Sequence, residues 1–222
     1  MALLNIAIDG PAGAGKSTIA KAVAGKLGIL YLDTGAMYRA LALSMLRAGI
    51  DPSDAPNVEK KLPEIEISAK SIDGVQHTYL NGEDVTGCIR TPEATKGASD
   101  IGVIPAVRAK MVKCQQAIAA QSDVIMDGRD ICMYVLPQSR NKFYITASVD
   151  ERAKRRLAEL RAKGEYLDAT FEQMRDEIEK RDYTDSHREC SPLRQAPDAV
   201  LIDTTDMDIE EAVETLLKQV KR

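Results

Sequence analysis

Gly-Pro-Ala-Gly-Ala-Gly-Lys-Ser at residues 10–17 matches the phosphate-binding pattern G-x-x-x-x-G-K-[ST] in full. An apolar run at residues 3–8 precedes it and an amphipathic stretch at residues 17–27 follows it, which predicts a strand, a loop and a helix in that order. The glycines let backbone N–H groups close around phosphate oxygens, and the start of the helix adds a favourable dipole. A turn that merely joined two elements would not need Lys16 and Ser17 at these offsets.

This P-loop predicts a site for a nucleoside triphosphate and magnesium. We expect Lys16 to reach the β and γ phosphates and Ser17 to coordinate the metal. Asp127 ends the apolar run 124–126 and resembles the second acidic element of P-loop proteins, which holds the metal directly or through water. An aspartate in that place is equally typical of a helix cap or a turn. The expected ATP-binding residues of the loop are Gly10, Pro11, Ala12, Gly13, Ala14, Gly15, Lys16, Ser17 and Thr18.

Strand and helix patterns alternate along the rest of the chain, which predicts an α/β fold with a parallel sheet flanked by helices. The further strands are expected at residues 29–32, 124–126, 142–146 and 199–202. The further helices are expected at residues 36–46, 92–103 and 106–120, after the capping boxes 148–151 and 170–173, and from Ile209 onward.

Residues 58–90 have a different character from the rest of the chain. Three prolines in residues 51–63 open the region, and residues 64–80 alternate polar and apolar side chains. Asn81-Gly82 tolerates positive φ at both central positions of a tight hairpin turn. We therefore expect a small β-rich insertion of antiparallel strands.

Composition excludes several classes of protein. At 222 residues, 44% hydrophobic and 29% charged, the chain is expected to form one soluble domain. It has no apolar run of ~18 to 20 residues and no secretory signal, which favours a cytoplasmic protein without a membrane partner. A net charge of -4 argues against nucleic acid as a partner. The absence of a long apolar stripe favours a monomer. No C-x-x-C pair, and hence no zinc site, is formed by Cys88, Cys114, Cys132 and Cys190.

Arginines gather on two predicted helix faces. Arg152, Arg155 and Arg156 share one face by their spacing, and Arg181 shares another with Asp185 and Arg188. Ordinary solvated ion pairs would explain such faces. Two further turns, at residues 33–39 and 127–130, bring arginines near strand ends, where ligands of open α/β sheets bind. This accumulation favours a kinase whose acceptor is itself a phosphate, because planar guanidiniums hold phosphates and screen the repulsion between two anions.

Other functions stay open at this point. A guanine-reading N-K-x-D element is missing after Asn141-Lys142, and the protein-kinase signatures H-R-D and D-F-G are absent, which leaves a small-molecule or nucleotide kinase. One alternative is a P-loop kinase of a small hydroxyl-bearing metabolite, with Asp33 as general base. A second alternative is an ATP-binding module without turnover.

Six segments, taken in their order and spacing, resemble the bacterial cytidylate kinase family over nearly the whole chain. They are GPAGAGKST at 10–18, DTGAMYR at 33–39, NGEDVTGCIRTPE at 81–93, DGRD at 127–130, RDYTDSHRECSPL at 181–193 and APDAVLIDTT at 196–205. The resemblance implies magnesium-dependent transfer of the ATP γ-phosphoryl group to CMP, and to dCMP, with release of ADP. It also implies a single P-loop kinase domain over residues 1–222, an acceptor-binding insertion at about 36–108 and a helical lid with flanking helices at about 152–189.

The resemblance further implies roles for individual residues. Cytosine would be faced by Ser99, Arg108 and Asp130. The rest of the CMP pocket would be lined by Thr34, Tyr38, Arg181 and Asp185, and the acceptor phosphate would be held by Arg39, Arg129 and Arg188. Arg152 and Arg156 would close over ATP. The catalytic residues would be Lys16, Arg129, Arg181 and Arg188. The chain departs from the family after Ile131, where Cys132, Met133 and Tyr134 replace smaller residues.

Overall fold

The computed structural model describes residues 3–162, 164 and 166–221. Its centre is a five-stranded sheet in the order β2-β6-β1-β7-β8, and every neighbouring pair is parallel. The strands are β1 (Asn5–Asp9), β2 (Leu30–Asp33), β6 (Val124–Gly128), β7 (Asn141–Thr146) and β8 (Val200–Asp203). The predicted parallel α/β core is thereby confirmed.

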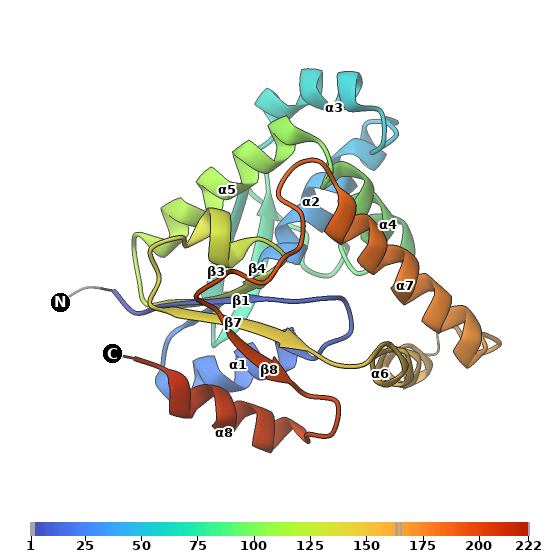
Figure 1. Ribbon diagram of the computed structural model, residues 1–222. Coiled ribbons are helices and arrows are strands. Elements are labelled where there is room, and N and C mark those ends of the chain that lie inside the picture. Colours follow the sequence, from blue (N-terminus) through green and yellow to red (C-terminus); the bar gives the residue numbers. More distant parts are fainter. Residues whose placement is uncertain (1–2, 163, 165, 222) are drawn as a thin grey trace.

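Helices cover both faces of this sheet (Figure 1). One face carries α1 (Lys16–Leu27) and α8 (Ile209–Gln219), and the other carries α2 (Thr34–Arg47), α5 (Pro105–Ala119) and the π-helical turn η2 (Ile131–Val135). The side chains of successive β1 residues point to alternate faces of the sheet. Ile6 and Ile8 pack in the cluster with α1 and α8, whereas Ala7 packs in the cluster with α2 and α5.

The insertion forms a second, antiparallel sheet of β3 (Ile67–Ile72), β4 (Val75–Leu80) and β5 (Glu83–Asp84). Asn81-Gly82 turns between β4 and β5 with φ of 48° and 85°, as expected. A second turn was not foreseen: Asp73-Gly74, at φ of 51° and 78°, divides the stretch 64–80 into two strands. The remaining short elements around the insertion are α3 (Ala55–Lys61), η1 (Leu62–Glu64) and α4 (Pro92–Ile101).

Two charged helices pack against each other beside the carboxyl end of the sheet, α6 (Val149–Ala162) and α7 (Phe171–His187). Thr170 and Gln173 form the predicted capping box, and Ser148 accepts the N–H of Glu151 at 3.2 Å. No helix of the described ranges is long and apolar enough to cross a membrane. The limits of insertion and lid within the chain remain predictions.

The P-loop depends on glycine at its first position. Gly10 follows β1 at φ 148°, and a Cβ there would lie 1.9 Å from the Ile145 carbonyl oxygen of β7. We predict that Gly10→Ala lowers the free energy of unfolding by about 2 kcal/mol or more, because both backbone strain and a clash with fixed backbone arise. Urea unfolding of the free protein measures this loss.

Gly25 is the matched control for that substitution. It lies exposed inside α1, and no heavy atom would lie within 4 Å of an added Cβ. Gly25→Ala should therefore raise the free energy of unfolding by roughly 0.5 to 1 kcal/mol. Equal effects of the two substitutions would contradict the account of the loop.

Candidate active site

The P-loop presents its backbone and one buried lysine at the carboxyl end of β1. Gly13 and Gly15 adopt left-handed φ of 75° and 81°, and Gly15 directly precedes α1. Lys16 is 6% exposed, and its Nζ donates to the Pro11 carbonyl at 2.6 Å. Burial, and then repulsion from Arg129, lowers the pKa of Lys16 to about 7. An anion in the loop would favour the protonated lysine.

Asp127 lies buried beside the P-loop and does not cap a helix. Its Oδ2 accepts the Ser17 hydroxyl at 2.8 Å, and its Oδ1 accepts the Tyr31 hydroxyl at 2.9 Å. Burial, reinforced by Asp33, raises the pKa of Asp127. The Asp127 carboxylate and the Ser17 hydroxyl lie side by side and are hard oxygen ligands of the kind that Mg²⁺ prefers. Tyr31 is not among the site residues predicted from the sequence, because its only signal is its place in the predicted strand 29–32.

Asp185 of α7 forms ion pairs with arginines from different segments. Arg129, which follows β6, donates from Nε to Asp185 Oδ2 at 2.7 Å, and Arg188 Nη1 lies 3.8 Å from Oδ1. Burial acts to raise the pKa of Asp185, but Arg129 and Arg181 lower it overall. Within the described chain, no carboxylate lies within ion-pair distance of Arg181. The cluster therefore holds more positive than negative charge.

Further arginines converge on Arg181 from both sides of the site. Burial, followed by repulsion from Arg129, lowers the pKa of Arg181 to about 10, and Arg156 and Arg39 add to the effect. Three buried guanidinium nitrogens of this region have no hydrogen-bond partner among the residues that the structure describes: Arg39 Nε, Arg181 Nε and Arg188 Nη2. Unused buried donors and surplus positive charge are the features of an anion site.

A second ion pair of the site is almost completely buried. Arg108 of α5 is ion-paired with Asp130, and both side chains are at most 5% exposed. Arg108 Nη1 also donates to the Gly102 carbonyl at 3.0 Å, and its guanidinium lies 5.6 Å from the centre of the Tyr38 ring. Burial, and then Arg108, lowers the pKa of Arg188, so the deep pair and the arginine cluster are electrostatic neighbours. Ser99 is half-buried on α4, the helix that Gly102 ends.

The start of α2 links these groups to β2. Asp33 caps the helix by accepting the N–H of Ala36 at 3.0 Å and pairs with Arg39 at 2.9 Å. The Thr34 hydroxyl donates to the Asp127 carbonyl at 2.7 Å. The Asp33 carboxylate is therefore already engaged at the mouth of the site.

The arginines of α6 have separate positions. Arg152, 4% exposed, donates to the carbonyls of Ala147 at 2.9 Å and of Ala12 at 3.0 Å, and pairs with Asp182 of α7 at 2.6 Å. It therefore joins the two charged helices to the P-loop backbone. Arg156 pairs with Glu159 along its own helix at 2.9 Å.

Arg155, which the sequence analysis placed on the same face but not among the site residues, lies beside the P-loop. It donates to the Thr204 carbonyl at 2.7 Å, and its Nη1 lies 3.9 Å from the Cβ position of Gly15. The spacing of the three arginines was the only signal that could have found it. Arg155 thus stands between the P-loop and the loop that follows β8.

Comparison with known proteins identifies the family to which this arrangement belongs. A family model described as "Cytidylate kinase" matches residues 6–222. The "Cytidylate kinase" of Caldicellulosiruptor bescii is 50% identical over 218 residues, which are 98% of this chain and 96% of the relative. The "Cytidylate kinase" of Limosilactobacillus reuteri is 47% identical over 219 residues, which are 99% of this chain and 96% of the relative. The chain belongs to the cytidylate kinase family. The resemblance inferred from the six segments is confirmed.

Solved structures of low sequence identity are similar to this chain in fold, and support no more than the fold. An uncharacterized protein from Eubacterium ventriosum has a TM-score of 0.54 at 14% identity, with 98% of both chains covered. A shikimate kinase from Bacteroides thetaiotaomicron has a TM-score of 0.50 at 17% identity, again with 98% of both chains covered.

Residues 132–134, which are larger than the resemblance to the family leads us to expect, are divided between the core and the surface. Cys132 is 1% exposed, and its Sγ lies 3.6 Å from the Ala7 carbonyl oxygen, whereas Met133 and Tyr134 are each 40% exposed.

Asp9, which is not among the site residues predicted from the sequence, holds the backbone of this segment. Its two carboxylate oxygens accept the N–H groups of Ile131 and Cys132, each at 2.8 Å. Burial raises the pKa of Asp9 to about 6.

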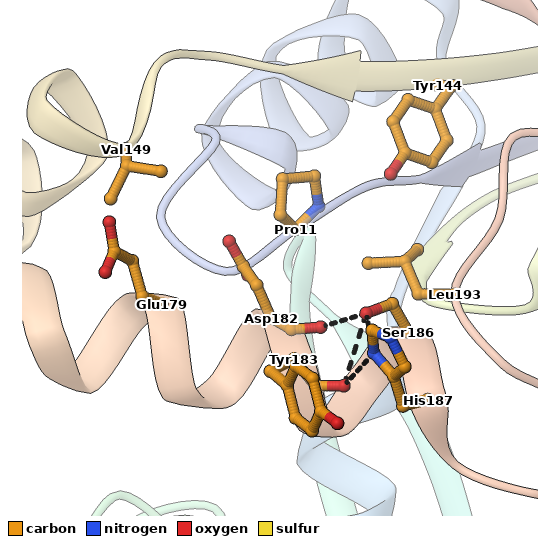
Figure 2. A pocket seen from close by; sticks show the side chains of 9 residues that line it. All are labelled: Pro11, Tyr144, Val149, Glu179, Asp182, Tyr183, Ser186, His187 and Leu193. Atoms are coloured by element: carbon orange, nitrogen blue, oxygen red, sulfur yellow. Dashed lines mark hydrogen bonds between the residues drawn. The ribbon is translucent and has the colours of Figure 1, made fainter.

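A cavity of about 400 Å³ opens between α7 and the segments that carry Pro11, Tyr144 and Val149 (Figure 2). It is lined by Pro11, Tyr144, Val149, Glu179, Asp182, Tyr183, Ser186, His187 and Leu193. Of the candidate ATP and acceptor residues only Pro11 lines it. Tyr183 and His187 stack at 4.0 Å on its rim. Asp182 and Ser186 face this cavity, whereas their neighbours Arg181 and Asp185 take part in the arginine cluster.

Asp185 is predicted to be essential for the stability of the cytidylate kinase fold. Asp185→Asn should lower the free energy of unfolding by about 3 kcal/mol or more near pH 7, because buried guanidiniums lose their counter-charge. The pKa of Asp185 is lowered from 3.8, so its contribution is present above that pH and is lost as the pH falls through the lower folded-state value. Urea unfolding as a function of pH measures both effects.

Asp198→Asn provides the matched control. Asp198 pairs with Lys142 at 2.8 Å, but its side chain is 63% exposed. Its replacement should cost less than about 1 kcal/mol. Similar losses for the two variants would show that the arginine cluster does not depend on Asp185.

Proposed function

We propose that this chain transfers the γ-phosphoryl group of ATP to the 5′-phosphate of CMP, and of dCMP, giving the nucleoside diphosphate and ADP. The observation that carries the proposal is the convergence of Lys16, Arg129 and Arg181. Repulsion from Arg129 and Arg181 lowers the pKa of Lys16, and repulsion from Arg129 lowers that of Arg181, while Arg129 is fixed beside Asp185 by a hydrogen bond of 2.7 Å. A chain of phosphates shared by donor and acceptor would neutralise this surplus of positive charge.

The donor nucleotide is assigned to the P-loop. Backbone N–H groups of residues 10–17 would surround the β-phosphate, and Lys16 would contact the β and γ phosphates. Ser17 and Asp127 would hold Mg²⁺, directly or through water. The metal would neutralise charge on the β and γ oxygens during transfer. Arg152 would support the loop through Ala12, and Arg156 would approach the phosphates from α6.

The acceptor phosphate is assigned to Arg39, Arg129 and Arg188, with Arg181 between acceptor and donor. Their unused donors could form bidentate bonds to a phosphate, and their charge would stabilise the transferring group. A phosphate monoester with a second pKa near ~6 is mostly dianionic at neutral pH, so no general base is required. Positioning and charge stabilisation are then the main contributions of the protein.

The base is assigned to the pair Arg108 and Asp130, with Ser99 nearby and with Thr34 and Tyr38 lining the pocket. A carboxylate accepts hydrogen bonds from the cytosine amino group, and a guanidinium donates to acceptors such as N3 and O2. Both side chains are buried, so a base that left them unpaired would bind more weakly.

The engagement of Asp33 disfavours the alternative kinase of a hydroxyl-bearing metabolite. A general base needs a free carboxylate within reach of the acceptor hydroxyl. The Asp33 carboxylate instead caps α2 and pairs with Arg39.

The experiment that tests the proposal measures ADP release from Mg-ATP with CMP, dCMP, UMP, AMP, GMP, shikimate or no acceptor. We predict turnover with CMP and dCMP, slower turnover with UMP, and background rates elsewhere. Lys16→Met serves as the control for contaminating ATPases and should lose the CMP-dependent rate. Turnover confined to shikimate, or ADP release that ignores the acceptor, would refute the assignment.

A further inference from the structure

Gln76 of the insertion bonds to the backbone of the core sheet. β2 lies at the edge of the sheet, and Asp33 is its last residue. The N–H and C=O of one strand residue point to the same side. The Asp33 N–H donates to Gln76 Oε1 at 2.6 Å, and Gln76 Nε2 donates to the Asp33 carbonyl at 3.2 Å. The side-chain amide of Gln76 therefore takes the place of a neighbouring strand at this one residue.

The amide of Gln76 is itself fixed. Its Nε2 also contacts the hydroxyl of Thr78 at 3.2 Å, two residues along β4, and Thr78 is 1% exposed. β4 and β3 both lie against β2, so the amide stands where the two sheets meet. Replacing it would leave the two backbone groups of Asp33 without these partners.

Asp33 transmits this contact to the acceptor side. Its backbone is held by Gln76, while its carboxylate caps α2 and pairs with Arg39. A second residue from the insertion region, Arg90, lies 4.0 Å from the same carboxylate. By contrast, the P-loop follows β1, whose neighbours in the sheet are β6 and β7. The side-chain contacts of Asp33 thus lead to the acceptor residues, whereas its connection to the ATP side runs through the register partner Asp127 in β6.

We propose that Gln76 is a positioning residue for the acceptor nucleotide. It locks the β3–β4 hairpin to the end of β2 and thereby sets the position of Arg39 and of the first turn of α2. The inference rests on the proposed function, because the acceptor is taken to be CMP. Gln76 touches neither reactant in this assignment, so its loss should change acceptor binding rather than the chemical step.

The test compares Gln76→Leu with His77→Leu. His77 is the next residue of the same strand, points to the other face and pairs with Asp84 at 2.6 Å in the insertion itself. Gln76→Leu should raise the KM for CMP roughly tenfold, as expected for the loss of two hydrogen bonds to a shared backbone. The KM for ATP and kcat at saturating CMP should change less than about twofold. His77→Leu should leave all three constants unchanged.

Amide hydrogen exchange at Asp33 provides a readout that needs no turnover. The Asp33 N–H should exchange faster in Gln76→Leu than in the wild type or His77→Leu. Equal protection in all three would overturn the contact even if the wild type proved inactive on CMP. An unchanged KM for CMP, or equal changes in the constants for both substrates, would overturn the positioning role. Should Gln76→Leu be poorly folded, Gln76→Met, which keeps an unbranched side chain, replaces it in both measurements.

Discussion

Repulsion among cations that lie close together and partly out of water is the constraint on which the rest of this structure depends. Lys16 comes from α1, Arg129 from the end of β6 and Arg181 from α7, and burial together with mutual repulsion lowers the pKa of two of them, Lys16 and Arg181. Holding such charges partly away from water costs free energy. Asp185 and Asp127 offset part of that cost. The part of this cost that the carboxylates do not offset would be relieved by an anionic ligand. The stability of the protein is therefore connected to its proposed chemistry.

Hydrogen bonds to backbone groups hold the separate parts of the site in register. Asp9 joins the end of β1 to the segment after Asp130, and Arg152 joins α6 and α7 to the P-loop. Gln76 joins the insertion to β2. Each of these side chains comes from a different element and forms at least one hydrogen bond to the backbone of another segment. The P-loop, the charged helices and the insertion are therefore connected at a few defined points.

Much of the fold and part of the site could be predicted from the sequence, because those features are local. The motif at residues 10–17, the alternation of strands and helices, and the Asn81-Gly82 turn each have short-range signals. The Asp73-Gly74 turn carries a similar signal but lies inside a continuous polar-apolar alternation, which concealed it. Tyr31 and Gln76 could not be found this way, because their roles arise from contacts between segments 43 to 96 residues apart.

The central claim is that the arginine cluster recognises the phosphate of the acceptor. Calorimetry of CMP and of cytidine without ATP tests it most directly, with Arg39→Met compared to Arg47→Met on the same helix, whose guanidinium instead pairs with the exposed Glu83. The account predicts that CMP binds the wild type at least about 100-fold more tightly than cytidine, and that Arg39→Met, but not Arg47→Met, loses a large share of that difference. Equal affinities for CMP and cytidine, or a difference that Arg39→Met leaves intact, would contradict the account.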